Sequence, residues 1–403
     1  MGRNPAMKAA VENSFPMNRT SPKYEGKPDI KEDKMKPAYR CIVWGPGIIG
    51  SVLIREILKK QEMKLVGVLA YNPEKNGKDV GEQYGMAPVG VRMTTNQEEI
   101  YALEADCVLF CPHLSAEVSI DSVAVNTICR LLESGKNVIT PIGLWYPPYH
   151  SQSLVDKLQK ACEKGGVSLH GTGVNPGWLY ERIVTTLTGA STRISHINVQ
   201  EVVDLMRVES ADMMRVLGFG LPMSETPKIE NAGDVGFSEC LALTCANMGV
   251  KLDRIELEKK YFTAGKDIKL IPYTVPEGTR AGCDFLYHAI VDGKRFLTLE
   301  EIWYVDHDDL PKGMVPGDYY NITIEGEPVS VKCTLELLAS AEKNIRFLEG
   351  DRTAPAWYAT GVNIIQTIPV VCGSQPGIVY PHNFANYCPD LRDFKSPLIN
   401  GKR

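Results

Sequence analysis

The sequence predicts an α/β protein that begins with a doubly wound parallel sheet and continues with a second α+β domain built on a mixed or antiparallel sheet. Between residue 40 and about residue 175, short apolar runs alternate with segments of helical periodicity. That alternation is typical of parallel strands joined by crossover helices. Beyond Gly177 the segments are longer and alternate between polar and apolar residues, as in strands that leave one face exposed.

The first part of the chain consists of short strands and helices in turn. A glycine, Gly135, stands where one of the helices should stop. The predicted strands are residues 40–45, 64–71, 106–112, 137–141 and 167–173. The predicted helices are residues 51–60, 80–85, 96–104, 122–135 and 153–166.

The second part has long segments with the period of strands, interrupted by helical ones. The predicted strands are residues 194–205, 254–264, 280–293, 296–306, 318–326 and 329–339. The predicted helices are residues 178–190, 210–220, 236–249 and 354–374. We expect the last helix to end at Pro369.

Composition narrows the class of protein. The 403 residues include 44 Lys and Arg against 49 Asp and Glu, so the net charge is −5, which disfavours binding to nucleic acid. No stretch of 18 or more apolar residues occurs, so we expect no membrane-spanning helix. The eleven cysteines are scattered, without C-x-x-C or zinc-ligand spacing. We therefore expect no metal site and a reducing, cytoplasmic compartment.

Residues 1–38 differ from the rest of the chain. They are rich in Lys, Pro and Asn and poor in aliphatic side chains. Such a segment cannot bury enough apolar surface to offset its conformational entropy, so we predict a disordered tail. Its acidic residues argue against a transit peptide.

The strongest local signal is the segment Gly45-Pro46-Gly47-Ile48-Ile49-Gly50, which follows a predicted strand and opens a predicted helix. In this setting G-x-G-x-x-G binds a dinucleotide in a Rossmann domain. Gly45 permits a tight turn, Gly47 lets the backbone approach a pyrophosphate, and Gly50 allows close packing of helix on strand. The start of the helix, at Ile48 and Ile49, would hold the phosphates through its amide groups.

The choice of cofactor depends on the end of the second strand. A carboxylate there binds the ribose 2′-hydroxyl of NAD, but this chain has Tyr71 or Asn72 at that position. Asn72 can bond a phosphate and Lys75 can neutralise it. We therefore favour NADP over NAD, which stays an alternative.

Three loops follow strand ends, where open α/β sheets bind their ligands. The first contains Pro112 and His113, and His113 is a possible proton donor beside the nicotinamide. The second runs from Thr140 to Pro148 and includes Gly143. In the third, Asn175 and Pro176 predict a helix N-cap followed by proline at the first helical position. Asn175 could also bind the carboxamide of nicotinamide.

Four motifs together resemble a known family. They are Gly45–Gly50, Tyr146-Pro147-Pro148, Gly171-Thr172-Gly173-Val174-Asn175-Pro176-Gly177 and Asn363-Ile364-Ile365-Gln366-Thr367-Ile368-Pro369. The chain resembles the dihydrodipicolinate-reductase-like oxidoreductases, over about residues 39 to 385. It is most similar to the branch with 2,4-diaminopentanoate dehydrogenase and the native amine dehydrogenases.

The resemblance implies a domain organisation and an activity. It implies a Rossmann domain at 39–178, a substrate and dimerisation domain at 179–350, a carboxy-terminal helix at 351–385 that returns to the Rossmann domain near Asn363, and a tail at 386–403. It implies a homodimer. It also implies hydride transfer between NAD(P) and an amine or imine carbon, in reductive amination of a ketone or oxidative deamination of an amine.

One position departs from that family. Its amine dehydrogenases carry a glutamate in the loop where this chain has Gly143-Leu144-Trp145-Tyr146, and the position aligns with Leu144. An apolar residue cannot move protons or orient an ammonium. Tyr146 in the same loop, or Asp204 or Glu209 after a strand of the second domain, are the candidates to replace it.

Aromatic and apolar side chains gather at the expected mouth of the site, so we predict a small, hydrophobic substrate. They are Leu144, Trp145, Tyr146, Trp178 and Tyr180, with Phe219 and Trp357 as further neighbours. Three functions stay open: an amine or imine oxidoreductase, an NAD(P)H-dependent reductase of C=O or C=C bonds that needs no ammonia, and a non-catalytic dinucleotide sensor. The leucine at 144 favours the second.

Overall fold

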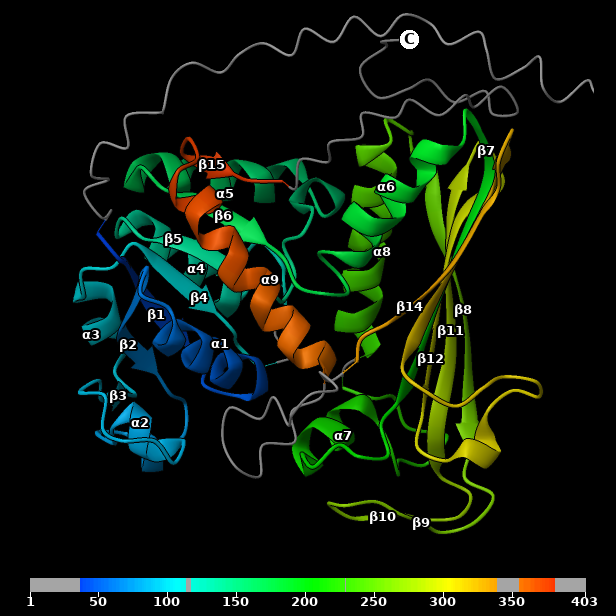
Figure 1. Ribbon diagram of the computed structural model, residues 1–403, viewed down its shortest axis with the longest axis horizontal. Helices are drawn as coiled ribbons and strands as arrows, with labels where there is room; N and C mark the ends of the chain where they lie inside the picture. Colours follow the sequence, from blue (N-terminus) through cyan, green and yellow to red (C-terminus); the bar gives the residue numbers. More distant parts are fainter. Residues whose placement is uncertain (1–36, 114–116, 229, 339–354, 381–403) are drawn as a thin grey trace, which may run out of the picture. The chain divides into compact units, whose positions relative to one another are not determined.

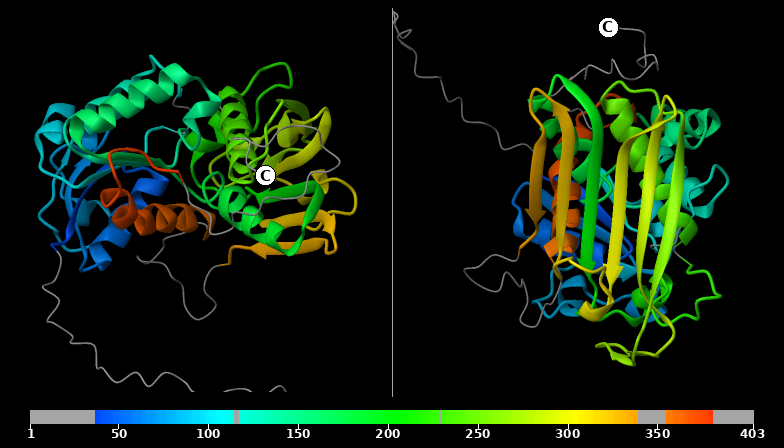
Figure 2. Two further views of the ribbon diagram at one scale, coloured as in Figure 1. Left: turned by 90° about the horizontal axis from the view of Figure 1, so that it is seen from above. Right: turned by 90° about the vertical axis from the view of Figure 1, so that its right-hand side faces the viewer.

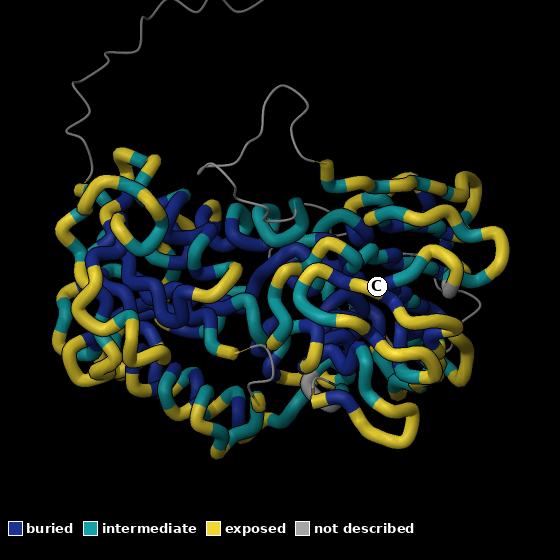
Figure 3. The backbone as a smooth tube through the Cα atoms, turned by 90° about the horizontal axis from the view of Figure 1, so that it is seen from below, coloured by how far each residue is buried: buried dark blue, intermediate teal, exposed yellow. Residues whose placement is uncertain are grey.

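The structure is a computed structural model that describes residues 37–113, 117–228, 230–338 and 355–380. The predicted tails at 1–38 and 386–403 lie outside these residues, apart from Pro37 and Ala38. Two sheets organise the described chain (Figure 1). Burial follows the two sheets and the inward sides of the helices that pack on them (Figure 3). The α/β class predicted from the sequence is confirmed.

The first sheet has seven strands in the order β15-β6-β5-β4-β1-β2-β3, and every neighbouring pair is parallel. Its strands are β1 (Tyr39–Trp44), β2 (Met63–Leu69), β3 (Met93–Thr94), β4 (Cys107–Phe110), β5 (Asn137–Thr140), β6 (Ser168–Gly171) and β15 (Gly377–Ile378). The order reverses between β1 and β4, which is where doubly wound sheets bind their ligands.

Helices cover both faces of this sheet. The apolar sides of α1 (Ile48–Lys59) and α9 (Pro355–Cys372) pack on one face. On the other face pack α3 (Gln97–Ala102), α4 (Val123–Glu133) and α5 (Gln152–Gly165) (Figure 2). A short helix, α2 (Val80–Gln83), precedes β3. At Gly361 of α9 a Cβ would lie 2.5 Å from Val52 of α1, so glycine lets these helices approach closely.

The second sheet has six strands in the order β14-β13-β7-β12-β11-β8. They are β7 (Arg193–Asp204), β8 (Arg254–Thr263), β11 (Arg280–Val291), β12 (Lys294–Tyr304), β13 (Tyr319–Glu327) and β14 (Val331–Glu336). The β7–β12 pair is parallel and the other pairs are antiparallel. The sheet is therefore mixed, one of the two arrangements that the sequence predicted.

One face of the mixed sheet packs against α8 (Glu230–Asn247) and a π-helical segment, Leu179–Val184. Figure 1 shows α8 between the two sheets. The right-hand view of Figure 2 shows the strands of the mixed sheet side by side, seen from the face opposite α8. The remaining elements are α6 (Thr185–Leu187), α7 (Ala211–Leu217) and the hairpin of β9 (Ile268–Lys269) and β10 (Thr274–Val275). No helix of the described chain is both long and apolar enough to cross a membrane.

The prediction that the last helix ends at Pro369 is wrong. Helix α9 continues to Cys372, with Pro369 inside it. A proline removes one backbone donor, but the Pro369 carbonyl still accepts a hydrogen bond from the Gly373 N–H at 3.1 Å. Ile368 and Val371 are fully buried against the sheet, so packing holds the last turn in place.

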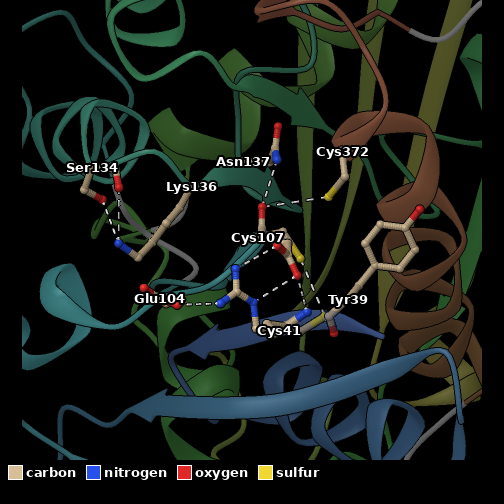
Figure 4. Close-up of polar contacts among 10 residues, drawn as sticks. Tyr39, Cys41, Glu104, Cys107, Ser134, Lys136, Asn137 and Cys372 are labelled. Carbon is tan, nitrogen blue, oxygen red and sulfur yellow. Dashed lines mark hydrogen bonds and ion pairs between the residues drawn. The ribbon is translucent and has the colours of Figure 1, made fainter. Parts of the chain in front are cut away.

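Hydrogen bonds tie together the amino-terminal ends of three central strands (Figure 4). The Arg40 backbone N–H donates to Asp106 Oδ2 at 2.6 Å, and the Arg40 guanidinium donates to Asp106 Oδ1 at 3.2 Å. Asn137 Nδ2 donates to the Asp106 carbonyl at 2.8 Å. The buried thiols of Cys41 and Cys107 lie 3.6 Å apart. These contacts lie at the end of the sheet opposite to the ligand-binding loops.

Candidate active site

A cavity of about 740 Å³ lies where the loops after β4, β5 and β6 face the second sheet. Its wall also includes parts of α8, the carboxyl end of β7, Trp303 of β12, the start of β13 and the start of α9. Ligands of open parallel sheets bind outside the carboxyl ends of the strands. The cavity is therefore the candidate site for a reacting substrate.

The glycine turn between β1 and α1 has the geometry of a phosphate-binding loop. Gly45 has φ +91°, and a Cβ there would lie 2.1 Å from the Cys111 carbonyl oxygen. A Cβ on Gly50 would lie 2.1 Å from the Gly45 carbonyl oxygen, whereas a Cβ on Gly47 would meet no atom within 4 Å. No side chain caps α1, so the amide groups of Ile48 and Ile49 suit an anion.

The residues expected to choose the cofactor lie next to this turn. Lys75 Nζ lies 3.4 Å from the Pro46 carbonyl oxygen, which places its ammonium beside the phosphate-binding loop. Asn72 Oδ1 accepts the Glu74 N–H at 2.9 Å and so caps a short turn. Asn72 therefore has a local structural role in addition to the predicted one.

Other residues predicted to bind cofactor are spread more widely. Gly143 lies in the cavity wall with φ +63°. Pro112 and His113 are outside the wall, and exposed His113 has its Nε2 3.3 Å from Asp212 Oδ2. Asn363 Nδ2 donates to the Ala359 carbonyl at 2.9 Å within α9, also away from the wall.

The structure brings only some of the predicted pocket residues to the cavity. Trp145 and Trp357 line the cavity, but Leu144 and Trp178 do not. Leu144 has φ +59°, and its side chain is buried in the core of the first sheet. This left-handed turn after Gly143 sends the leucine into the core and leaves Trp145 in the wall. Of the other residues in the sequence prediction, Tyr180 is core, and Phe219, one of the two further neighbours, lines a separate pocket of about 30 Å³.

Of the three predicted replacements for the loop glutamate, Asp204 lies in the cavity wall, whereas Tyr146 and Glu209 do not. Tyr146 is outside the cavity wall and packs its ring on Tyr380, with centroids 5.8 Å apart. Its burial raises the pKa of its hydroxyl. Asp204 lies in the wall, but Oδ1 accepts the Met206 N–H at 2.9 Å and Oδ2 lies 3.2 Å from His307 Nε2. The structure therefore argues against Tyr146 as the catalytic group and gives Asp204 structural partners.

Sequence reasoning missed a pair of carboxyl groups in the mixed sheet. Glu201 of β7 and Glu301 of β12 are register partners, 6% and 1% exposed, and Glu201 lines the cavity. Trp303 Nε1 lies 3.4 Å from Glu201 Oε2 and donates to Glu301 Oε2 at 3.2 Å. Burial, and then the neighbouring Glu201, raise the pKa of Glu301 well above its ordinary value.

Asn175 links the third loop to this pair. Its Nδ2 donates to Glu201 Oε2 at 2.9 Å and to Glu301 Oε1 at 3.3 Å. Its Oδ1 is buried and has no partner among the described residues. The predicted N-cap is wrong, because the helical segment begins only at Leu179 and the Asn175 side chain points to the two carboxyl groups instead.

A third buried acid, Glu239 of α8, lies in the same cavity wall. Its Oε1 accepts the Tyr146 N–H at 2.6 Å. Its Oε2 lies 3.5 Å from His150 Nε2, and His150 also lines the cavity. Among the described residues neither Glu239 nor the Glu201–Glu301 pair has a Lys or Arg partner within ion-pair distance.

A signal for the pair is present in the sequence. Along residues 296–306 the inward positions are Leu297, Leu299, Glu301 and Trp303, and the first two are core residues. A glutamate on the apolar side of an alternating strand is costly to bury. Such a residue is therefore a candidate functional group.

No group of three or more His, Cys, Asp or Glu side chains that could hold a metal ion occurs in the described part of the chain. The nucleotide loop, by contrast, fits a dinucleotide. A parallel sheet in this order, the glycine turn and a cavity at the strand ends are the features of a Rossmann-type dinucleotide-binding protein.

Comparisons with known proteins identify the family. Residues 39–137 match the model for the amino terminus of dihydrodipicolinate reductase, and residues 178–384 match that for the 2,4-diaminopentanoate dehydrogenase C-terminal domain. The second match covers just over half of the chain, and the chain belongs to this family. It is an NAD(P)-dependent oxidoreductase.

Individual relatives agree with this assignment. The chain is 28% identical to an amine dehydrogenase of Streptomyces virginiae, over 78% of this chain and 88% of the relative. It is 25% identical to a 2,4-diaminopentanoate dehydrogenase of Acetoanaerobium sticklandii, over 84% and 91%. A solved structure of an amine dehydrogenase from Mycobacterium smegmatis matches in fold, with TM-score 0.67, 20% identity and coverage of 86% and 98%.

Proposed function

We propose that the protein transfers a hydride between NADP and an amine or imine carbon, in reductive amination of a ketone or the reverse deamination. The observation that carries this proposal is the set of buried carboxyl groups at the cavity. Glu201 and Glu239 lie in its wall, and Glu301 lies directly behind Glu201. The curated relatives, named for amine dehydrogenases, support the same chemistry.

Buried acids without a Lys or Arg partner are unusual, because desolvation penalises the ionised form. Such groups favour a cationic ligand, which restores the missing charge interaction. Ammonium and protonated amines are the cations that a nicotinamide-dependent redox reaction brings into such a site. The apolar remainder of the wall, including Trp145, Trp357 and Phe237, supports a hydrophobic substrate carbon skeleton.

The chain's own residues would hold the cofactor at two places. The amides at the start of α1 would bind the pyrophosphate, next to Gly47. Lys75, beside the same loop, would neutralise a 2′-phosphate, which supports NADP over NAD. When bound, the nicotinamide supplies or accepts the hydride.

We also propose the homodimer and the cytoplasmic location expected from the sequence. Within the described ranges, no helix packs across the face of the mixed sheet opposite α8 (Figure 2), which leaves that face as the proposed contact with a second copy. The described cysteines are unpaired, and all but Cys333 and Cys372 are buried. Unpaired thiols fit a reducing compartment.

A second function is supported by one observation. Leu144, which the sequence resemblance aligns with the family glutamate, is buried in the core and cannot act on a substrate. A proton held by the Glu201–Glu301 pair and presented to the cavity by Glu201 would suit a reductase that donates a hydrogen bond to a carbonyl and uses no ammonia. This is the ammonia-independent reductase of the sequence prediction.

The test is NADPH oxidation by the full-length protein with hydrophobic ketones and aldehydes, with and without excess ammonium, repeated with NADH. We expect turnover that requires ammonium and is faster with NADPH. Turnover that is the same without ammonium would replace the amine proposal with the carbonyl reductase. A protein that binds NADPH without turnover in either arm would fit the sensor.

A further inference from the structure

The register of the mixed sheet places three polar side chains in one row. Glu201 of β7 is opposite Glu301 of β12 on one side and Tyr320 of β13 on the other. Asn175 Nδ2 and Trp303 Nε1 each lie within hydrogen-bond distance of both carboxyl groups, so the two groups lie side by side. Beyond Glu301 the next residue in the row is Phe285 of β11, and only then comes Lys259 of β8.

Phe285 separates the pair from that lysine. Lys259 Nζ bonds instead to Glu230 and Asp234 of α8. Lys228 lines the same cavity but is exposed and makes no ion pair with either glutamate among the described residues. The other titratable groups that interact with the pair from the surrounding elements carry no positive charge. They are Tyr180 of the π-helical segment, Cys240 of α8, Cys283 and Tyr287 of β11, and Asp318 and Tyr320 at the start of β13.

Two carboxylates in contact, buried and without a cation, cannot both stay ionised at modest cost. One proton shared between the two carboxyl groups leaves the pair with a single negative charge. A hydrogen bond from the protonated group to the ionised one holds that proton in the pair. The Asn175 amide and the Trp303 indole donate to both carboxyl groups. In all four contacts a carboxyl oxygen accepts from an N–H group, so the shared proton lies on the side away from Asn175 and Trp303.

We propose that Glu201 and Glu301 form a one-proton unit that takes the place of the loop glutamate. In this unit Glu201 is the catalytic residue and Glu301 its positioning partner. The inference rests on the proposed amine chemistry and names the groups that perform its proton transfers. Glu201 lines the cavity, whereas Glu301 is 1% exposed and reaches a substrate only through Glu201.

The proton balance of reductive amination fits such a unit. An ammonium ion bound at the pair gives one proton to Glu201, so the pair then holds two protons and the ammonia is neutral. Ammonia adds to the ketone carbon to give a carbinolamine. Glu201 returns the proton to the carbinolamine hydroxyl, which leaves as water and produces an iminium carbon. Hydride addition then gives the neutral amine, and the pair holds one proton again.

Asn175 Oδ1 adds an acceptor to this site. Its Nδ2 is fixed by the two carboxyl groups, so Oδ1 has no described partner and faces away from them. An ammonium beside Glu201 can donate one N–H to the carboxylate and another to this amide oxygen. The loop Gly171–Gly177 thus supplies an acceptor to the cation as well as two donors to the pair.

The variants that test the inference are Glu201→Gln and Glu301→Gln, with Glu300→Gln as the matched control. Glu300 is the next residue on β12, points to the other face and accepts from Gln200 Nε2 at 2.7 Å. Glu201 accepts from Asn175 and Trp303 through Oε2 alone, so the amide nitrogen of Glu201→Gln can take the place of Oε1, and stability measured by urea unfolding should change little. Both oxygens of Glu301 accept an N–H, so Glu301→Gln turns one donor toward another and should lower stability. Glu201→Gln keeps the inference testable if Glu301→Gln folds poorly.

Two measurements are made on full-length enzyme. In turnover, we expect Glu201→Gln to lower kcat/KM for ammonium about 100-fold or more, and Glu300→Gln to stay within about 2-fold of the parent protein. The pH profile of kcat/KM reports on Glu301. The raised pKa of Glu301 predicts an alkaline limb in the parent profile, and Glu301→Gln should lose that limb because glutamine has no proton to release.

The second measurement is binding of cyclohexylammonium, against cyclohexanol, to the NADPH-loaded protein by calorimetry. We expect at least about 10-fold weaker binding of the cation to Glu201→Gln and no change for the alcohol. Ammonium-dependent turnover that survives both glutamine variants unchanged would refute the unit and leave the proposed function intact. Pair-dependent cation binding without ammonium-dependent turnover would refute the proposed function and keep the cation site. A parent protein that does not prefer the cation to the alcohol refutes the inference.

Discussion

Two glycines of the same turn, Gly47 and Gly50, should respond differently to replacement by alanine: one should lose affinity for the cofactor and the other should lose stability. A Cβ on Gly50 would lie 2.1 Å from the Gly45 carbonyl oxygen and 3.3 Å from Val43 Cγ1. A Cβ on Gly47 would meet nothing within 4 Å. Gly50→Ala should therefore destabilise the fold, and Gly47→Ala should affect only what binds above the turn.

The magnitudes follow from these distances. The Gly50 contact is with backbone and is more than 1 Å shorter than the 3.4 Å at which ordinary contact begins, so α1 has to move away from β1. Overpacking of this kind costs about 1–3 kcal/mol. Gly47 has φ −83°, which alanine adopts without strain, so its unfolding free energy should change by less than about 0.5 kcal/mol. Its new methyl group stands where the pyrophosphate approaches, so we expect the Kd for NADPH to rise at least about 10-fold, or about 1.4 kcal/mol.

The assay pairs urea unfolding with NADPH binding measured by fluorescence titration, for both variants and the parent protein. Gly47→Ala should keep the unfolding midpoint and lose affinity. Gly50→Ala should lower the midpoint. A Gly47→Ala protein with parental NADPH affinity would show that the cofactor does not lie over this turn. A Gly50→Ala protein of parental stability would show that the helix and strand are not in contact there.

Three further predictions are independent of this turn. Lys75→Ala should raise KM for NADPH about 10-fold and leave KM for NADH within about 2-fold, because only NADPH carries the 2′-phosphate; Lys78→Ala is the exposed control, and an equal effect on both cofactors would contradict the assignment. Tyr146→Phe should keep kcat within about 3-fold, since its side chain is outside the cavity wall; a loss of 100-fold would restore it as a catalytic group. Burial lowers the pKa of His170 to about 4, below its unfolded value near 6.5, so the unfolded chain binds the extra proton, and stability should fall by up to about 3 kcal/mol as pH drops from about 6.5 to 4. His170→Gln should make the free energy of unfolding in urea depend less on pH in this range than it does in the parent protein. An unchanged pH dependence would contradict the buried neutral imidazole.

The fold was largely predictable because periodicity records burial. A strand buried on both faces, such as β4, is a short unbroken apolar run, and the amphipathic helices that cover the sheet have a different period. The glycine turn was predictable because only glycine tolerates its geometry. A Cβ at Gly45 or Gly50 would lie 2.1 Å from a backbone carbonyl oxygen, and Gly45 has φ +91°. The end of α9 was not, because tertiary packing of Ile368 and Val371 outweighed the local effect of Pro369.

The site was less predictable, since loop paths and strand register are long-range properties. Nothing local in the sequence says that Leu144 takes a left-handed conformation and enters the core. Likewise Glu201 and Glu301 are separated by a hundred residues and meet only because β7 and β12 pair in parallel with this register. Each glutamate alone resembles a surface residue. Its burial can be inferred only by noting that it lies on the same face of its strand as the apolar residues two positions away.

Because Glu201 and Glu301 lie on neighbouring strands, the proposed acid–base pair depends on the register between β7 and β12. A one-residue slip of β12 against β7 would turn Glu301 to the other face and replace it with Glu300 or Ile302. The residues that fix the register are the inward apolar neighbours of the pair, Val199 on β7 and Leu299 on β12, which are themselves register partners and fully buried. Core packing and proton chemistry therefore depend on the same alternation. Substitutions such as Leu299→Ala should accordingly lower ammonium-dependent activity as well as stability, even though this side chain is outside the cavity wall.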